Sequence, residues 1–306
     1  MVRKMRLGSS SLEVPVLAVG CMRMNKIEKP EAERFIQTAL EEGVNFFDHA
    51  DIYGHGECEE IFAEAIHMND DVRENIILQS KCGIRKGMFD FSKEHILESV
   101  DGILHRLRTD YLDVLLLHRP DALVEPEEVA ETFDILKSSG RVRNFGVSNH
   151  NPMQIQLLQK YVKVPLVANQ LQLSITNSTM IKSGLNVNME NDAAVNRDGS
   201  VLDYCRLNDI TIQPWSPFQY GFFEGVFLGN EKFPELNQRI DEIAAKYEVT
   251  NTTIAIAWLL RHPADMQPII GTMNTERLKD CCKATTIHLT REEWYSIYRA
   301  AGNILP

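Results

Sequence analysis

Four side chains able to move protons are spread through the first half of the chain: Asp48, Tyr53, Lys81 and His118. A free tyrosine has a pKa of about 10, so it donates protons slowly at neutral pH. An ammonium such as Lys81 favours the phenolate and is expected to lower that pKa, while Asp48 would hold the lysine in place. Tyr53 could then protonate an alkoxide, with His118 hydrogen-bonded to the same oxygen.

Such a proton transfer suits carbonyl reduction, in which a hydride reaches the carbonyl carbon while the oxygen gains a proton. No side chain carries a hydride, so this chemistry needs a bound cofactor. The second half of the chain contributes amide, hydroxyl and aromatic groups instead of titratable ones: Ser148, Asn149, Gln170, Trp215, Ser216 and Thr272. This division predicts a catalytic cluster that faces a cofactor-binding surface.

Eight short runs rich in β-branched and aromatic residues precede these side chains, and longer segments of helical periodicity separate them. The runs span residues 14–19, 44–47, 76–79, 114–117, 144–147, 166–169, 210–213 and 267–270. Several are apolar on both faces, as expected for a parallel sheet that is covered on both sides. Eight strand–helix repeats favour a (β/α)8 TIM barrel over a doubly wound sheet. The candidate residues fall at the carboxyl ends of the strands, where the chemistry of such barrels lies.

Three regions interrupt this alternation. Residues 1–13 are short and polar, which predicts a plug or a hairpin, whereas residues 171–200 and 217–235 predict long loops at the carboxyl-terminal face. A capped helix is predicted from Thr290. No Pro- or Ser-rich linker divides the chain, so we expect residues 1–306 to form a single domain.

Composition narrows the possible partners. The net charge of -11 argues against a nucleic-acid binder, although it leaves room for a local basic pocket that binds a phosphorylated cofactor. Six scattered cysteines without metal-ligand spacing suit a reducing compartment, so we expect a cytoplasmic protein without a metal. No apolar stretch approaches the length of about 20 residues that a membrane-spanning helix needs. Residues 17–21 superficially resemble the end of a lipoprotein signal. The apolar run that leads to them is short and is interrupted by Glu13 and Pro15, so we do not expect a secretory signal.

The ordered motifs resemble those of the aldo-keto reductase family. They are DHADIYG at residues 48–54 with Glu59 and Glu60, then Lys81, LHRP at 117–120, GVSN at 146–149, NQ at 169–170 and WSP at 215–217. Each piece is weak alone, but together they are specific, and the resemblance covers residues 7–284. It is similar to the bacterial branch of uncharacterised oxidoreductases.

The resemblance implies a role for each matched residue. Asp48, Tyr53, Lys81 and His118 would form the catalytic tetrad that reduces an aldehyde or ketone. The implied cofactor-binding residues are Gly20, Cys21, Met22, Ser148, Asn149, Gln170, Trp215, Ser216, Phe218, Gly221, Gly271, Thr272, Asn274 and Arg277. Among these, Trp215 would stack on the nicotinamide ring. The guanidinium of Arg277 and the hydroxyl of Thr272 suit a 2′-phosphate, which favours NADPH over NADH.

Three positions depart from the family pattern. His49 occupies a position that usually carries Ser or Thr, which places an imidazole beside Asp48. Gly271 stands where many members carry Lys, and Cys281 replaces a frequent Asn near the adenine. The last two weaken the expected preference for NADPH more than they weaken the expected reaction.

Other interpretations stay open at this point. Asp48 and Lys81 alone could be a structural ion pair, and His49, Asp51 and His118 could bind a metal, although a third clear ligand is missing. The same fold also serves as a cofactor-sensing subunit, as in the β subunits of potassium channels. Three aromatic residues of the predicted loops, Phe89, Phe91 and Tyr220, indicate an apolar or aromatic substrate pocket. The substrate and the oligomeric state are not predicted.

Overall fold

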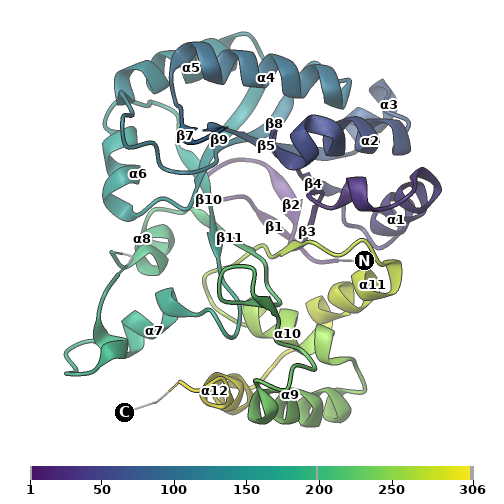
Figure 1. The fold of residues 1–306 in the computed structure, drawn as a ribbon, viewed down its shortest axis with the longest axis vertical. Helices are drawn as coiled ribbons and strands as arrows, with labels where there is room; N and C mark the ends of the chain where they lie inside the picture. Colours follow the sequence, from purple (N-terminus) through teal and green to yellow (C-terminus); the bar gives the residue numbers. More distant parts are fainter. Residues whose placement is uncertain (1, 198, 304–306) are drawn as a thin grey trace.

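The computed structural model describes residues 2–197 and 199–303, so residues 1, 198 and 304–306 lie outside the description. Eight parallel strands form its centre (Figure 1). They are β3 (Ala18–Gly20), β4 (Phe46–Asp48), β5 (Ile77–Cys82), β8 (Leu112–Leu117), β9 (Val142–Ser148), β10 (Leu166–Gln172), β11 (Thr211–Trp215) and β14 (Ile269–Ile270). Each overlaps one of the eight predicted runs, so the predicted (β/α)8 barrel is confirmed.

The strands follow one another around the barrel in chain order, and β14 pairs with β3. The contact between β11 and β14 differs from the other contacts between neighbouring strands. Between β11 and β14 the sheet order of the described residues has no paired ladder, but the backbone N–H of Gln267 donates to the carbonyl of Ile212 at 3.0 Å. The barrel is therefore nearly closed, with a seam between β11 and β14.

Helices cover the outside of the barrel (Figure 1). They are α1 (Lys29–Glu41), α2 (Glu57–Ala65), α3 (Asp70–Glu74), α4 (Lys93–Leu107), α5 (Pro126–Ser138), α6 (Pro152–Gln159), α7 (Thr179–Leu185), α8 (Val201–Leu207), α9 (Pro234–Tyr247), α10 (Asn251–Leu260), α11 (Thr275–Lys283) and α12 (Arg291–Ala300). In α4 the apolar positions Ile96, Val100 and Ile103 face the barrel, and Ser92 caps the helix as its hydroxyl accepts from the backbone of His95. The predicted helix after Thr290 is confirmed as α12, with a capping box between Thr290 and Glu293.

The first residues form the predicted hairpin, in which β1 (Lys4–Arg6) pairs antiparallel with β2 (Glu13–Pro15). The single strand predicted over residues 14–19 is therefore wrong, because Val14 pairs with Met5 in the hairpin and the barrel strand starts at Ala18. Leu7, which is fully buried, packs with Val14 and Ala18 in a cluster of its own inside the barrel. The hairpin thus fills one end of the barrel.

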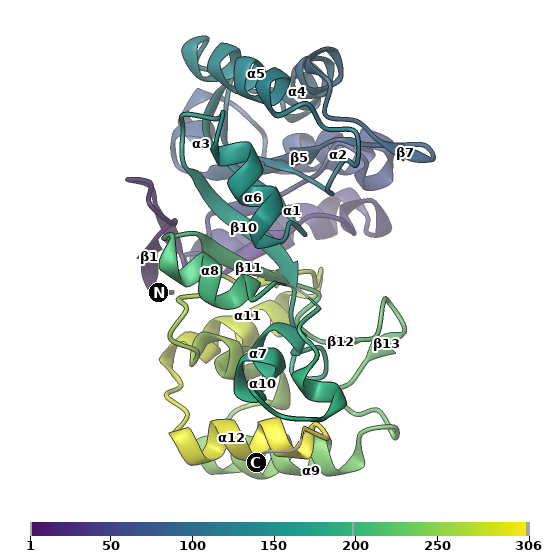
Figure 2. The same cartoon turned by 90° about the vertical axis from the view of Figure 1, so that its left-hand side faces the viewer.

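Two further hairpins project from the opposite end (Figure 2). One joins β6 (Ile84–Arg85) to β7 (Met88–Phe89), and the other joins β12 (Gln219–Tyr220) to β13 (Gly225–Val226). The second lies within the predicted loop 217–235, and the predicted loop 171–200 contains α7. We call these two hairpins the rim. Their side chains include the exposed Met88, Phe89 and Phe222.

Candidate active site

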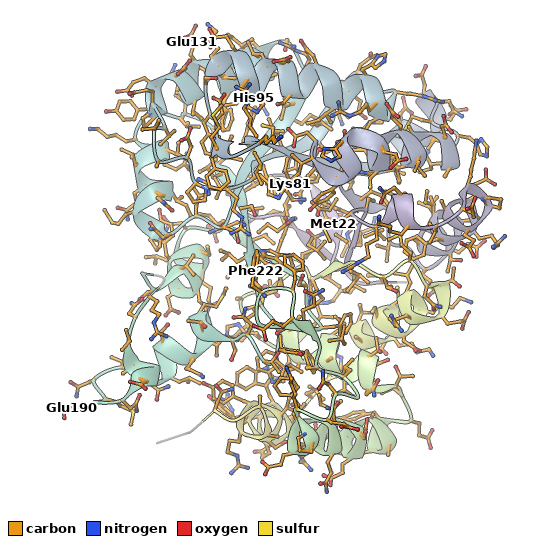
Figure 3. All side chains as sticks on the ribbon, viewed as in Figure 1. Met22, Lys81, His95, Glu131, Glu190 and Phe222 are labelled. Atoms are coloured by element: carbon orange, nitrogen blue, oxygen red, sulfur yellow. The ribbon has the colours of Figure 1, made fainter. Side chains whose placement is uncertain are left out.

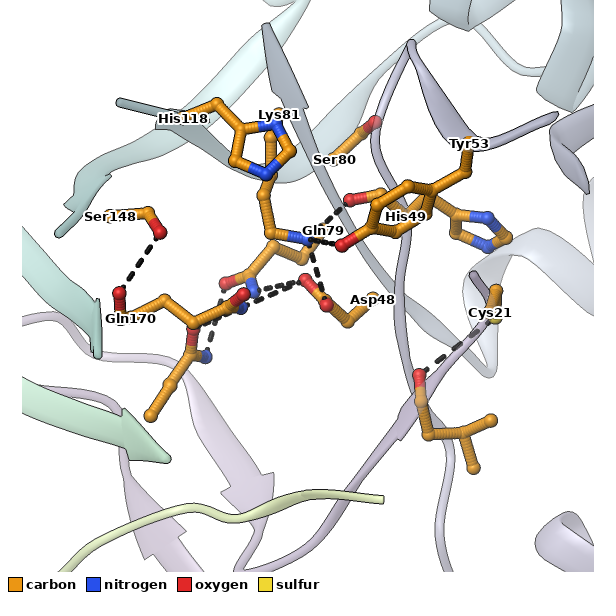
Figure 4. A network of polar contacts seen from close by, with 12 residues as sticks. Cys21, Asp48, His49, Tyr53, Gln79, Ser80, Lys81, His118, Ser148 and Gln170 are labelled. Carbon is orange, nitrogen blue, oxygen red and sulfur yellow. Dashed lines mark hydrogen bonds and ion pairs between the residues drawn. The ribbon is translucent and has the colours of Figure 1, made fainter. Parts of the chain in front are cut away.

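Three of the four side chains predicted to move protons come from three neighbouring strands. Asp48 is the last residue of β4, Lys81 lies in β5, and His118 follows β8. Lys81 Nζ donates to Asp48 Oδ2 at 2.8 Å, to the carbonyl of His49 at 2.7 Å and to the Tyr53 hydroxyl at 3.1 Å (Figure 4). Since the parallel strands end at the same edge of the sheet, residues far apart in sequence meet here.

Tyr53 owes its position to a tight turn after β4. It begins a short 3-10 segment, Tyr53–Gly56, in which Gly54 adopts φ 58. A Cβ at Gly54 would lie 2.7 Å from Asn25 Nδ2, so this turn needs the glycine for space as well as for its backbone conformation. The Tyr53 ring then meets the His118 ring edge-on, with centroids 6.1 Å apart.

The Asp48 carboxylate is held by more than the lysine. Its Oδ1 accepts from Gln79 Nε2 at 2.7 Å and from Gln170 Nε2 at 3.1 Å. Gln79 and Gln213 exchange two amide hydrogen bonds, and Gln213 Nε2 donates onward to Gln267. Gln267 in turn donates to the carbonyl of Pro15 in the hairpin that fills the other end of the barrel. We call Asp48, Gln79, Lys81, Gln170, Gln213 and Gln267 the polar floor.

Burial shapes the acid–base properties of the cluster. It raises the pKa of the Tyr53 phenol, because desolvation of the phenolate outweighs the opposite effect of Lys81. The predicted lowering is therefore wrong as a net effect, although Lys81 acts in the predicted direction. Burial alone would lower the pKa of Lys81, but Asp48 and Tyr53 raise it. For His118, burial and then the charges of Lys81 and Arg119 lower the pKa well below its ordinary value, so the imidazole is neutral.

A cavity of about 790 Å³ opens above these groups at the carboxyl-terminal end of the barrel. Asp48, Tyr53 and His118 reach its surface, whereas Lys81 lies beneath them and is fully buried. A tyrosine hydroxyl and a neutral imidazole are thus available to the same bound molecule. This arrangement can donate two hydrogen bonds to one oxygen atom and can deliver a proton to it.

Most of the predicted cofactor-binding residues line the same cavity. They are Gly20, Met22, Ser148, Asn149, Gln170, Trp215, Ser216, Phe218, Gly271, Thr272, Asn274 and Arg277. Asn149 connects several of them, since its Nδ2 donates to Ser148 Oγ at 2.8 Å and its Oδ1 accepts from Trp215 Nε1 at 3.2 Å. Asn149 and Ser216 have φ values of 60 and 52, left-handed conformations that are typical of functional sites in residues other than glycine.

Two predicted cofactor residues lie elsewhere. Cys21 is buried, and its thiol donates weakly to the carbonyl of Val19 at 3.8 Å, away from the cavity. Gly221 lies in the tip of the β12–β13 hairpin, where its carbonyl accepts from Gln172. Neither belongs to the residues that line the cavity. Their contact with a cofactor stays a prediction and would require a backbone contact or movement of the hairpin.

The predicted aromatic lining is wrong in its members. Phe91 is buried and packs parallel to His150, and Phe89 and Tyr220 lie outside the lining. Instead, Phe218 and Phe223 line the cavity with Trp215, and the ring of Phe223 stacks on Trp215 with centroids 5.7 Å apart. Phe222, near the hairpin tip, meets the Trp215 ring edge-on, with centroids 6.5 Å apart (Figure 3). The order of residues in these loops did not reveal which aromatic side chains face the cavity.

His49, the first departure from the family pattern, points away from the cavity. Its imidazole is fully buried against the edge of Phe62, and neither ring nitrogen has a hydrogen-bond partner among the described residues. Burial, followed by the charge of Lys81, lowers its pKa to about 3. The side chain therefore stays neutral behind the cluster, while its backbone carbonyl accepts from Lys81.

A metal site would need several ligands to converge. In the part of the chain that the structure describes, no group of three or more His, Cys, Asp or Glu side chains is placed to hold an ion. The alternative built on His49, Asp51 and His118 gains no support from this arrangement. All six cysteines are buried free thiols, and no described helix has the length and apolarity that crossing a membrane requires.

Residues 16–301 match the model of the Aldo/keto reductase family, so the chain belongs to this family of oxidoreductases. It is 36% identical to the uncharacterised oxidoreductase YcsN of Bacillus subtilis over 92% of each chain. It is 32% identical to the oxidoreductase YdhF of Escherichia coli over 98% of each, and 31% identical to a 6-dehydroglucose reductase of Agrobacterium fabrum over 96% of each. A crystal structure of the thermostable aldo-keto reductase Tm1743 with the inhibitor epalrestat superposes with a TM-score of 0.78, at 26% identity over 98% of this chain and 100% of that one.

Proposed function

We propose that this chain reduces an aldehyde or ketone to an alcohol with NADPH, and that Tyr53 donates the proton. The observation that carries the proposal is the convergence of Lys81 Nζ on Asp48 and Tyr53, with Tyr53 and His118 both at the cavity surface. When bound, the nicotinamide would supply a hydride to the carbonyl carbon. Since the chain spans nearly the whole length of its relatives, we also propose that it acts as one domain.

The chain's own residues would do the rest. Tyr53 and His118 would both hydrogen-bond the carbonyl oxygen and fix its position. As negative charge develops on that oxygen, the Tyr53 hydroxyl would transfer its proton, and Lys81 at 3.1 Å would stabilise the resulting phenolate. Asp48 keeps the ammonium in place through the 2.8 Å contact. His118 is neutral at neutral pH because its pKa is lowered, so it would position the carbonyl oxygen through a hydrogen bond from its ring N–H and would not serve as the acid.

The residues that line the cavity support the proposal of a phosphorylated dinucleotide. The lining includes Tyr53, His118 and Trp215, and it also includes Arg23, Arg34 and Arg277. Guanidinium groups in the lining suit a phosphate, although the chain as a whole carries a net charge of -11. Trp215 would stack on the nicotinamide and Arg277 would contact the 2′-phosphate, which supports the preference for NADPH.

Replacement of Tyr53 by Phe tests the proposed proton donor. We expect turnover of an aldehyde to fall by about 10²- to 10⁴-fold, because the transition state loses its proton source. The affinity for NADPH, measured by tryptophan fluorescence, should stay within about twofold, since the phenol itself makes no proposed cofactor contact. Unchanged turnover would disprove the assigned role of Tyr53.

Titration with NADPH and with NADH tests the cofactor. We expect saturable quenching at lower concentrations of NADPH, and an Arg277→Met variant that loses this difference. Equal affinity for the two cofactors in the wild-type protein would contradict the phosphate assignment but not the reaction. Multiple turnover would separate the proposed enzyme from a cofactor-sensing subunit, which would stop after one cycle with the cofactor bound.

A further inference from the structure

Arg119 is the charged side chain beside the proposed proton donor that the mechanism does not use. It directly follows His118, and it lines the cavity near Trp215, with its guanidinium carbon 5.9 Å from the Trp215 ring centroid. Its charge contributes to the lowered pKa of His118, and the charge of Tyr53 acts on its own pKa in return. The guanidinium is therefore close to the place where the carbonyl oxygen would bind.

Within residues 2–197 and 199–303, no carboxylate or hydrogen-bond acceptor binds the Arg119 guanidinium. Among the described residues, Arg119 makes no ion pair and no hydrogen bond, although its side chain is half-buried. Two acidic side chains near this segment, Asp121 and the Asp90 that precedes its partner Phe91, are engaged elsewhere. Asp121 accepts from the backbone of Phe91 and Leu123, and Asp90 pairs with Arg85. A half-buried cation without a counter-ion has lost hydration without recovering it from the protein, so it favours binding of an anion.

The charge balance at this end of the cavity points the same way. The Lys81 ammonium and the Asp48 carboxylate neutralise each other at 2.8 Å, and His118 is uncharged. Arg119 thus leaves one net positive charge beside the carbonyl position. The lining also includes the apolar side chains of Ile52, Phe223 and Val226. Such a site combines a place for an apolar or aromatic body with one place for a negative charge.

We propose that Arg119 binds an anionic group of the substrate, which makes the substrate a carbonyl compound that also carries a carboxylate or similar anion. This inference rests on the proposed carbonyl reduction and specifies its substrate class. The arginine fork can accept a carboxylate through two parallel hydrogen bonds. That contact would orient the molecule so that its carbonyl oxygen reaches Tyr53 and His118.

A matched pair of aldehydes tests the proposal: 4-carboxybenzaldehyde and its neutral methyl ester, methyl 4-formylbenzoate. We expect the wild-type protein to have the higher kcat/KM for the carboxylate. In Arg119→Met the carboxylate-to-ester ratio of kcat/KM should fall by about 10- to 100-fold, the range expected for one lost charge-assisted hydrogen-bonded pair. Arg119→Lys should recover part of the ratio. Arg206→Met, which removes one surface charge from α8, should leave the ratio unchanged.

Binding experiments separate the possible failures. Calorimetry with 4-carboxybenzyl alcohol in the presence of NADP⁺ should show binding that Arg119→Met weakens by a similar factor. If neither aldehyde were turned over, the proposed function would fail, while this binding would still uphold the anion site. An equal ratio in the wild-type protein and Arg119→Met, or equal binding of the alcohol, would overturn the proposal. So would an equally large loss of NADPH affinity in Arg119→Met, since it would assign the guanidinium to the cofactor.

Discussion

The polar floor and the rim lie on opposite sides of the cavity and are built in different ways. In the floor every polar group named above has a partner, and Gln79, Lys81, Gln213 and Gln267 are fully buried. In the rim, Phe222 is 67% exposed and Met88 is 50% exposed, and short two-residue strands hold the hairpins. The floor fixes the groups that would carry the reaction, whereas the rim is free to vary with the substrate. The difference suits a family in which one chemistry serves many carbonyl compounds.

The largest difference in stability between variants of the two regions should come from breaking their ion pairs. Replacing Lys81 by Met leaves the Asp48 carboxylate buried without its counter-ion, and we expect a loss of about 3–5 kcal/mol in the free energy of unfolding. The matched rim variant is Arg85→Met, which breaks the exposed pair with Asp90 and should cost less than about 1 kcal/mol. Urea unfolding measures both. Similar losses would show that the floor is no more tightly coupled than the rim.

Glutamine replacements sharpen the comparison at neutral groups. Gln213→Leu removes the partner of the buried Gln79 and Gln267 amides, so we expect about 1–3 kcal/mol of destabilisation. Turnover should also fall, because Gln79 then loses the contact that orients it toward Asp48. Gln172→Leu breaks the bond to Gly221 in the rim and should cost about 0.5–1 kcal/mol with little effect on turnover. A Gln213→Leu variant with full stability and turnover would contradict a positioning role for the amide chain.

The pH dependence of stability should reveal the buried imidazole behind the floor. The pKa of His49 is about 3 in the folded chain and about 6.5 when unfolded, so the unfolded state takes up a proton that the folded state refuses. Stability therefore falls as the pH falls below about 6.5. Between pH 6 and 4, the free energy of unfolding should decrease less steeply in His49→Leu than in the wild-type protein. The two slopes should differ by about 1.4 kcal/mol per pH unit. A slope in His49→Leu equal to that of the wild-type protein would contradict the burial of a neutral imidazole at this position.

The sequence alone predicted the site residues whose positions follow from the order of strands and helices. Once eight strand–helix repeats indicate a barrel, parallel strands must end at one face, and Asp48, Lys81 and His118 meet there. The partner of Gln79 could not be predicted in the same way. Gln213 lies 134 residues away, and their contact depends on the stagger of strands on opposite sides of the barrel. Periodicity reports which residues are buried but not which of them face one another.

Two site properties were missed for different reasons. The net pKa shift of Tyr53 depends on how deeply the phenol is buried, a tertiary quantity that residue type does not contain. Arg119 is visible in the LHRP segment, but neither its residue type nor its position after a strand indicates whether a counter-ion faces it. Its significance comes from the lack of a counter-ion among the described residues, which only the arrangement of Asp90 and Asp121 reveals.

The seam between β11 and β14 would give the proposed cofactor a second role. Trp215 ends β11 on one side of the seam, and Gly271, Thr272 and Arg277 follow β14 on the other. A dinucleotide bound as proposed would bridge the two sides where the backbone itself contributes little pairing. Bound cofactor would therefore stabilise the barrel at the seam. Amide hydrogens near Ile212 and Gln267 should then exchange with solvent faster in the cofactor-free protein than in the cofactor-bound protein. The exchange rate at this joint would then report the fraction of molecules that carry cofactor.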